Sequence, residues 1–201
     1  AASDVYKRQI LYNDEITKLW SNPLLRYSNI LSGLFHEKVV VCESDYDCLF
    51  YQAIIDAVCE HNNEIAPDIL FTHCGGKARV KDVVSALKAV DVPVVAICDF
   101  DLINSKQVFK PIIESFEVDW TSKLSSDMKI IYDSINAKNS SQNDGWAQLK
   151  KIGKAGLLGD EPAAYDRVEA ICKSAGLFII PVGEMECFDT VSYTHLTLPT
   201  T

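Results

Sequence analysis

Short apolar runs alternate with longer amphipathic stretches along this chain. Four runs are rich in β-branched and other apolar residues, and they cover residues 38–42, 68–73, 93–98 and 177–182. Apolar runs of this length, without regular polar alternation, are typical of strands buried on both faces. Their alternation with helical stretches predicts an α/β fold, in which a parallel four-stranded sheet carries helices on both faces.

Apolar residues at helical spacing predict the helices. Residues 46–60 follow Ser44 and Asp45, either of which can cap a helix, and residues 80–90 form a second amphipathic helix. Between the third and fourth strands, further helices are predicted over residues 106–116, 125–137, 146–154 and 161–174. We interpret them as a helical insertion, at about residues 104–175, within a sheet domain that spans residues 38–189.

The two ends of the chain encode each other's antisense strand. Codons chosen for residues 1–9, read on the opposite strand, give the Val-Ser-Tyr-Thr-His-Leu-Thr-Leu of residues 191–198. Such a pair resembles a transposase-type sequencing adapter read in both orientations, so we expect residues 1–9 and 190–201 to be adapter-derived. On this interpretation the chain is an internal fragment, and residues 10–37 are a helical lead-in from an upstream region, with a break at Pro23.

Composition excludes some classes of function. With 19 basic and 28 acidic residues the net charge is −9, so a general basic surface for wrapping nucleic acid is not expected. Seven cysteines without a C-x-x-C pair indicate reduced, mostly buried thiols in a cytoplasmic protein. No apolar run approaches the roughly 18 residues of a membrane span, and we expect no membrane association.

Carboxylates follow three of the four predicted strands. They are Glu43, Asp47, Asp99, Asp101, Glu184 and Glu186. The carboxyl ends of parallel strands meet at one edge of a sheet, where function gathers in open α/β folds. If the backbone stays extended after the strands, residues i and i+2 point the same way. The pairs after the third and fourth strands could then each share one ligand.

Such a cluster of carboxylates is expected to bind cations. Like charges that converge on one edge repel each other and raise their own pKa values. Mg²⁺ prefers oxygen ligands, whereas zinc would require His or Cys, and His73 is the one native histidine near a predicted strand exit. Because a carboxylate-held metal pair is a standard arrangement for attack on phosphodiesters, the pattern predicts a divalent-metal site for phosphodiester chemistry.

A glycine-rich turn with a cation follows the second strand. It consists of Gly75, Gly76 and Lys77, which we interpret, from position alone, as a phosphate-binding turn. The chain has no G-x-x-x-x-G-K-[ST] loop, and two glycines are too few for a dinucleotide fingerprint.

These residues resemble a known family. Val39-Val-Val-Cys-Glu43-Ser-Asp-Tyr-Asp47 resembles the first motif of Toprim domains, the fold shared by primases, topoisomerases and several nucleases, and Ala96-Ile-Cys-Asp99-Phe-Asp101 is similar to their D-x-D motif. The Glu-x-x-x-Asp spacing, the Gly-Gly-Lys turn and Gly183-Glu184-Met-Glu186 resemble the C-terminal Toprim domain of OLD-type (overcoming lysogenisation defect) ATP-dependent endonucleases. Leu31-Ser-Gly-Leu-Phe-His-Glu-Lys38 resembles the segment that joins their ATPase to this domain.

The resemblance implies a Rossmann-like Toprim sheet and a set of site residues. The metal ligands that it implies are Glu43, Asp47, Asp99, Asp101, Glu184 and Glu186. Of these, Glu43, Asp99 and Asp101 would be catalytic, and Glu43 would also assist proton transfer. The implied cofactor is a pair of Mg²⁺ or Mn²⁺ ions. Ser44 stands where the family usually has a glycine, which alters the approach of the backbone to a phosphate there.

The implied function is that of a Mg²⁺-dependent endonuclease or nickase domain acting on DNA. It would be part of a larger ATP-dependent nuclease, with ATP bound in an upstream ATPase domain, and a homodimer is left open. Two other hypotheses remain. One is a phosphatase- or receiver-like α/β domain that uses Asp99 as nucleophile or phospho-acceptor, and the other is a non-catalytic Toprim-like assembly module.

Overall fold

A computed structural model describes residues 17, 29–139, 145–184 and 188 of the chain. The expected adapter-derived residues 1–9 and 190–201, most of the expected lead-in, and Glu186 lie outside the described residues. Within the lead-in, which was expected to be helical on both sides of a break at Pro23, Asn29–Phe35 forms the 3₁₀ helix η1.

Four parallel strands form the central sheet. They are β1 (Lys38–Cys42), β2 (Ile69–His73), β3 (Val94–Cys98) and β4 (Leu177–Ile179), in the order β2-β1-β3-β4. The predicted α/β fold with a parallel four-stranded sheet is confirmed. Because Cys42 pairs with His73 and Cys98 with Ile179, the strands end side by side at one edge.

The fourth strand is shorter than predicted. A strand over residues 177–182 was expected, but β4 ends at Ile179. The Ile180 N–H still donates to the Cys98 carbonyl at 2.9 Å. Pro181 comes next and has no N–H to continue the ladder, so the chain leaves the sheet there and turns back over its edge.

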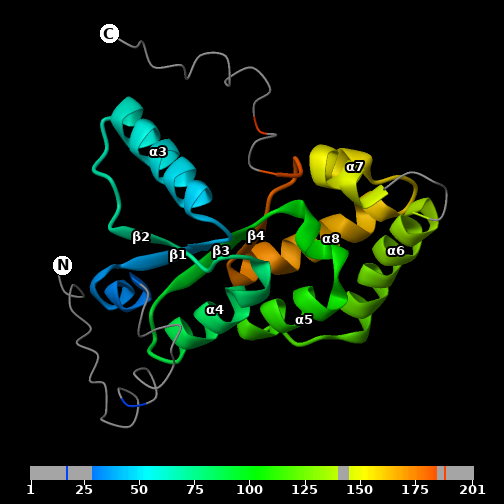
Figure 1. The fold of residues 1–201 in the computed structure, drawn as a ribbon, viewed down its shortest axis with the longest axis horizontal. Coiled ribbons are helices and arrows are strands. Elements are labelled where there is room, and N and C mark those ends of the chain that lie inside the picture. The colour runs from blue at the N-terminus through cyan, green and yellow to red at the C-terminus, as the bar shows by residue number, and fades with distance from the viewer. Residues whose placement is uncertain (1–16, 18–28, 140–144, 185–187, 189–201) are drawn as a thin grey trace, which may run out of the picture.

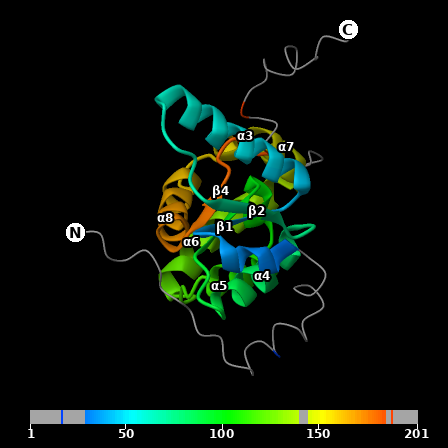
Figure 2. The same ribbon diagram turned by 90° about the vertical axis from the view of Figure 1, so that its left-hand side faces the viewer.

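Helices cover both faces of the sheet, but unequally. Helix α3 (Asp45–Asn62) packs on β1 and β2 from one side, and α4 (Val80–Lys88) and α5 (Lys106–Ser115) lie on the other, as Figures 1 and 2 show. The core beneath α3 is small and centres on Val40, Cys42 and Cys48. The larger core lies on the α4 face and carries most of the buried apolar side chains of the described chain.

Local capping interactions explain where α3 begins and α4 ends. The Ser44 hydroxyl accepts the Asp47 N–H at 3.2 Å, and the Asp47 carboxylate accepts the Ser44 N–H at 2.8 Å, which completes a capping box. Helix α4 ends at Lys88, before the predicted limit of residue 90, and Asp91 turns the chain with a left-handed φ of 54°.

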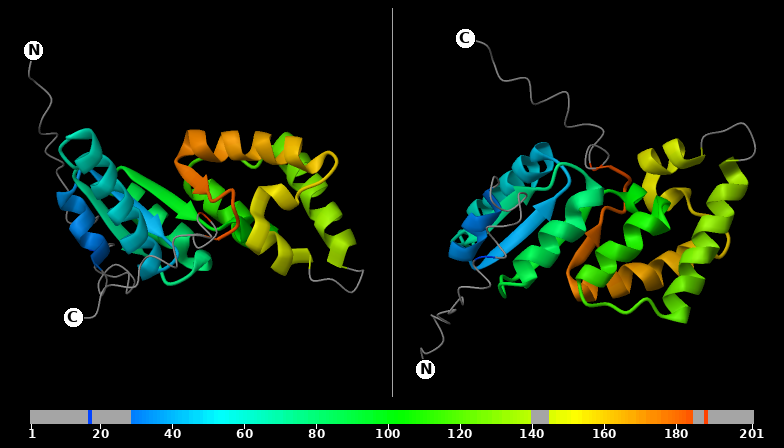
Figure 3. Two further views of the ribbon diagram at one scale, coloured as in Figure 1. Left: turned by 90° about the horizontal axis from the view of Figure 1, so that it is seen from above. Right: turned by 60° about the horizontal axis from the view of Figure 1, so that its bottom comes forward.

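The predicted helical stretch between β3 and β4 is present. It contains η3 (Phe100–Asn104), α5, α6 (Ser122–Asn139), α7 (Gly145–Ile152), η4 (Gly153–Gly156) and α8 (Glu161–Ala175). Helices α6 and α7 stand beside the sheet rather than over it (Figure 3). The Arg167 guanidinium donates hydrogen bonds from Nε and from a terminal nitrogen to the buried Asp127 carboxylate, the latter at 2.6 Å. This ion pair connects α8 to α6. No helix in the described part of the chain has the length and apolar content to cross a membrane.

One glycine joins this helical stretch to the exit of β4. Gly153 has a φ of 57° and is buried, and a Cβ placed on it would collide with the Pro181 carbonyl and the Gly183 amide. The Lys154 N–H also donates to the Pro181 carbonyl at 2.8 Å. The segment that follows β4 is therefore held in place by close backbone contact with η4.

We predict that Gly153→Ala destabilises the protein more than Gly159→Ala. Gly159 has a similar φ of 61° but is exposed, with nothing near the position of an added Cβ. Its alanine variant therefore suffers only the left-handed backbone strain, about 1–2 kcal/mol, while Gly153→Ala adds an overlap that costs roughly 1–3 kcal/mol more. Urea unfolding followed by circular dichroism measures the difference, and equal losses would contradict the close packing at Gly153.

Candidate metal centre

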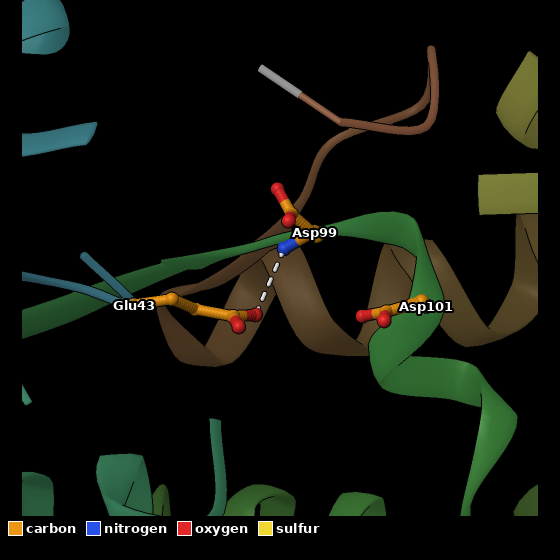
Figure 4. A group of neighbouring side chains, drawn as sticks. All are labelled: Glu43, Asp99 and Asp101. Atoms are coloured by element: carbon orange, nitrogen blue, oxygen red, sulfur yellow. Dashed lines mark hydrogen bonds between the residues drawn. The ribbon is translucent and has the colours of Figure 1, made fainter. Parts of the chain in front are cut away.

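Three of the predicted carboxylates meet at the strand-exit edge. Each of Glu43, Asp99 and Asp101 offers one carboxylate oxygen, and these oxygens all lie within 4.8 Å of one another (Figure 4). Glu43 directly follows β1, Asp99 follows β3, and Asp101 lies in η3. All three side chains are half-buried. We call these three residues the acidic triad.

Asp99 and Asp101 come together through a 3₁₀ turn and not through the extended backbone that was expected. The segment does not stay extended after β3, because the 3₁₀ helix η3 begins at Phe100. The Phe100 ring is buried, with its centroid 5.1 Å from that of Tyr165 on α8. Burial of this ring turns the chain sharply, and Asp101 then faces the same space as Asp99.

Backbone hydrogen bonds join the exits of neighbouring strands around the triad. The Asp99 N–H donates to the Glu43 carboxylate at 3.1 Å, which links β3 to β1. The Phe100 N–H donates to the Gly183 carbonyl at 2.8 Å, which links η3 to the segment after β4, and the Gly76 N–H donates to the Glu43 carbonyl at 2.9 Å. The triad therefore rests on main-chain contacts from all four strand exits.

Crowding and burial strongly disfavour the charged forms of two of these carboxylates. Burial is the main cause that raises the pKa of Glu43 to about 7; the charge of Asp101 adds to it and the Asp99 N–H opposes it. Burial also raises the pKa of Asp99 to about 7, followed by the charges of Glu43 and Asp47. Without a cation, each of these two carboxyls is thus partly protonated at neutral pH.

Lys77 contacts the triad, although it was predicted to bind phosphate. Its Nζ lies 2.7 Å from an Asp101 carboxylate oxygen and donates to the Asp101 carbonyl at 3.4 Å. The turn before it needs its glycines, because Gly75 and Gly76 have φ values of 74° and 119°. The Gly76 amide is engaged by Glu43, and phosphate binding by Gly75, Gly76 and Lys77 stays a prediction.

The other predicted ligands lie outside the group of three. Asp47 is engaged in the capping box of α3, and the Glu184 carboxylate pairs with Lys150 Nζ at 2.6 Å. Their charges still contribute to the raised pKa of Asp99, so both belong to the surroundings of the triad. Glu186 lies outside the described residues. A ligand role for Asp47, Glu184 and Glu186 stays a prediction.

Sequence reasoning missed both lysine partners of the site. Lys77 contacts a residue 24 positions away, and Lys150 comes from α7 in the helical stretch. Neither pairing leaves a local pattern, since each depends on how distant segments pack. An isolated lysine near a strand exit was the only available signal, and it existed for Lys77 alone.

Two buried thiols, Cys74 and Cys98, lie in the electrostatic field of the triad. Cys98 ends β3 and Cys74 follows β2, and both are buried in the larger core, whereas Cys42 at the end of β1 belongs to the smaller core beneath α3. Burial raises the pKa of Cys98 well above its ordinary value and that of Cys74 to about 11. Both thiols are therefore protonated at neutral pH, and the triad itself offers carboxylate oxygens. Such a set fits a hard cation better than a thiophilic one.

Comparison with known proteins agrees with the resemblance seen in the motifs. Searches of curated proteins and of solved structures gave no match. Residues 34–101 match the family model described as "Overcoming lysogenization defect protein-like, TOPRIM domain". The matched segment contains the whole acidic triad and Lys77 and ends at Asp101. The expected family is thereby confirmed for this segment: residues 34–101 carry an OLD-like TOPRIM domain, a kind of domain that implies nucleic-acid processing.

Proposed function

We propose that this domain is the Mg²⁺-dependent nuclease domain of a larger ATP-dependent endonuclease that cleaves or nicks DNA by phosphodiester hydrolysis. The observation that carries the proposal is the acidic triad, with carboxylate oxygens of Glu43, Asp99 and Asp101 within 4.8 Å of one another. The OLD-like TOPRIM match over the same residues supports it.

The charge balance of the triad supports a divalent cation. Lys77 pairs with Asp101, whereas Glu43 and Asp99 have no ion pair among the described residues. Their raised pKa values, each about 7, reflect burial first and neighbouring carboxylate charge second, and a bound cation would offset both effects. Glu43, Asp99 and Asp101 would hold Mg²⁺ or Mn²⁺, and Asp47, Glu184 and Glu186 are predicted to complete a two-ion site.

The chain's own residues have distinct tasks in this reaction. A bound divalent cation would supply Lewis-acid polarisation of the phosphoryl group and a lowered pKa of bound water. Glu43 would in addition assist proton transfer, as a carboxylate at a reacting centre can. Lys77 fixes the orientation of Asp101, and the Asp99 N–H does the same for Glu43.

DNA binding by an acidic chain needs positive charge from elsewhere. The chain's net charge is −9, so nonspecific attraction to a phosphate backbone is weak. Bound cations would supply part of the charge, and the rest would come from other regions of the larger nuclease, including the ATPase domain that we propose lies upstream.

We predict that Asp99→Asn abolishes Mg²⁺-dependent nicking of supercoiled DNA by a protein that contains this chain. The substitution keeps the shape of the side chain but removes a charge from the triad, and loss of one ligand to a catalytic metal typically costs 100-fold or more, roughly 3 kcal/mol of barrier. Gel assays of nicked plasmid with Mg²⁺ and with EDTA measure the effect.

Asp82→Asn is the matched control. Asp82 is exposed on α4, outside the triad, and the same chemical change there should leave nicking unaltered. Full activity in the Asp99 variant would sink the metal-nuclease assignment. Recovery of a covalent phospho-aspartate from the wild type, absent in the Asp99 variant, would instead favour the phosphatase- or receiver-like hypothesis.

We predict that Mg²⁺ stabilises the protein more at about pH 8 than at about pH 6. In the folded state Glu43 and Asp99 both have pKa values of about 7, against ordinary values of 4.5 and 3.8. The folded protein therefore keeps protons that the unfolded chain has lost, and this contribution to stability falls as pH rises from about 4 to about 7. Mg²⁺ competes with those protons, so its affinity should rise up to about ten-fold per pH unit for each proton displaced.

Thermal unfolding with and without Mg²⁺ across this pH range measures the effect. Asp99→Asn removes one of the titrating groups, so its midpoint should depend less on pH and respond weakly to Mg²⁺. A Mg²⁺ effect that is equal at both pH values, or equal in wild type and variant, would contradict binding at the triad.

A further inference from the structure

A lysine from the helical stretch reaches the strand-exit edge. Lys150 lies in the last turn of α7, and its Nζ is 2.6 Å from the Glu184 carboxylate, in the segment after β4. The hydrogen bond to Glu184 is the main cause that raises the pKa of Lys150, and the charges of Asp101 and Asp99 add to it. The ammonium therefore lies in the field of the acidic triad as well as beside Glu184.

Backbone packing fixes this lysine relative to the triad. Gly183 has a φ of 112°, and a Cβ on it would collide with the backbone of Lys150 and approach that of Lys151. The carbonyl of the same glycine accepts the Phe100 N–H at 2.8 Å, between Asp99 and Asp101 in the chain. One residue thus contacts the end of α7 on one side and the triad's own turn on the other.

Neighbouring lysines are placed differently. Lys154 pairs with Asp166 on α8, at 2.5 Å, rather than with a carboxylate that follows a strand. Lys151 is exposed, and its side chain has no polar partner among the described residues. Lys150 is the lysine of this part of α7 that combines an ion pair at the strand-exit edge with electrostatic coupling to the triad.

In this ion pair, the Glu184 carboxylate is bound by the Lys150 ammonium. Glu184 lies outside the triad although it follows β4 at the same edge. The two side chains are 44% and 28% exposed, and an ion pair this accessible to water adds little stability. Each member can therefore exchange its partner for a stronger one: phosphate for the lysine, a divalent cation for the glutamate.

We propose that Lys150 is a phosphate-contacting residue of the site and that the Lys150–Glu184 pair opens when nucleic acid binds. Lys150 then contacts a backbone phosphate, and Glu184 is released toward the cation at the triad. The proposal rests on the proposed function in one respect, that the ligand is a nucleic acid. Its consequence is that the helical stretch supplies part of the substrate contact.

Lys150→Met and Lys151→Met, on the same turn of α7, test the phosphate contact. The probe is a short fluorescent DNA duplex, and its anisotropy is followed in EDTA, where cleavage cannot occur. Lys150→Met should weaken binding about ten-fold and lower the slope of log affinity against log salt by about one, as expected for one lost phosphate contact. Lys151→Met should change both much less, and Lys150→Arg should keep the affinity of the wild type.

Glu184→Gln tests the exchange of partners, because it should act in the opposite direction. It frees Lys150 and removes a negative charge, so DNA affinity in EDTA should rise. In titrations of the DNA-free protein with Mg²⁺, Lys150→Met should bind Mg²⁺ more tightly than the wild type because Glu184 is released, and Glu184→Gln should bind it less tightly.

The outcomes separate this proposal from the metal-nuclease assignment. If Asp99→Asn loses its response to Mg²⁺ while Lys150→Met and Lys151→Met bind DNA alike, the Lys150 proposal fails and the metal centre stands. If wild type and Asp99→Asn respond to Mg²⁺ alike, the metal centre fails, whatever Lys150 contacts. Should Lys150→Met not fold, Lys150→Arg and Glu184→Gln still decide: a fall in DNA affinity in either one overturns the proposal.

Discussion

Crowding of negative charge at the ends of parallel strands is the constraint on which this structure depends. Strand pairing brings Glu43, Asp99 and Asp101 to one edge, with carboxylate oxygens within 4.8 Å of one another, and all three side chains are half-buried. Repulsion in such a place would force the edge apart unless something offset it. Lys77 neutralises one carboxylate and the Asp99 N–H supports another. At neutral pH, partial protonation of Glu43 and Asp99 lowers the remaining negative charge. A bound cation can take the place of these protons.

The helical stretch between β3 and β4 helps to hold this edge together. Gly153 and Gly183 allow backbone to meet backbone where a side chain would collide, and these contacts seat the segment after β4 between η4, the end of α7 and η3. Rigid positioning of this kind is what a multi-carboxylate site needs, because small displacements of ligands change metal affinity steeply. The stretch therefore contributes to the site through packing as well as through the charge of Lys150.

The local sequence pattern predicted the strands of the sheet and the carboxylates of the triad. Contacts between distant segments determine the remaining features of the site. The β-branched runs of β1 and β3 determine their strands, strand polarity places Glu43 and Asp99 at one edge, and the pairing of β1 with β3 places them side by side. The end of β4 at Ile179 follows from Pro181, a signal that could have been used. By contrast, the 3₁₀ turn after Asp99 depends on burial of Phe100 against Tyr165 of α8, and the partners of Lys77 and Lys150 depend on distant segments. Periodicity does not encode such contacts.

The site has two parts that differ in origin along the chain. The triad and Lys77 lie within the segment that matches the OLD-like TOPRIM domain, whereas Lys150 and Glu184 follow it. The first part has more carboxylates than its lysine neutralises, whereas in the second part a lysine pairs with the carboxylate. Gly183 contacts both α7 and the turn between Asp99 and Asp101. A shift of α7 would therefore move residues in both parts of the site. The charge state of the triad and the partner of Lys150 are therefore physically coupled, through one glycine and a common electrostatic field.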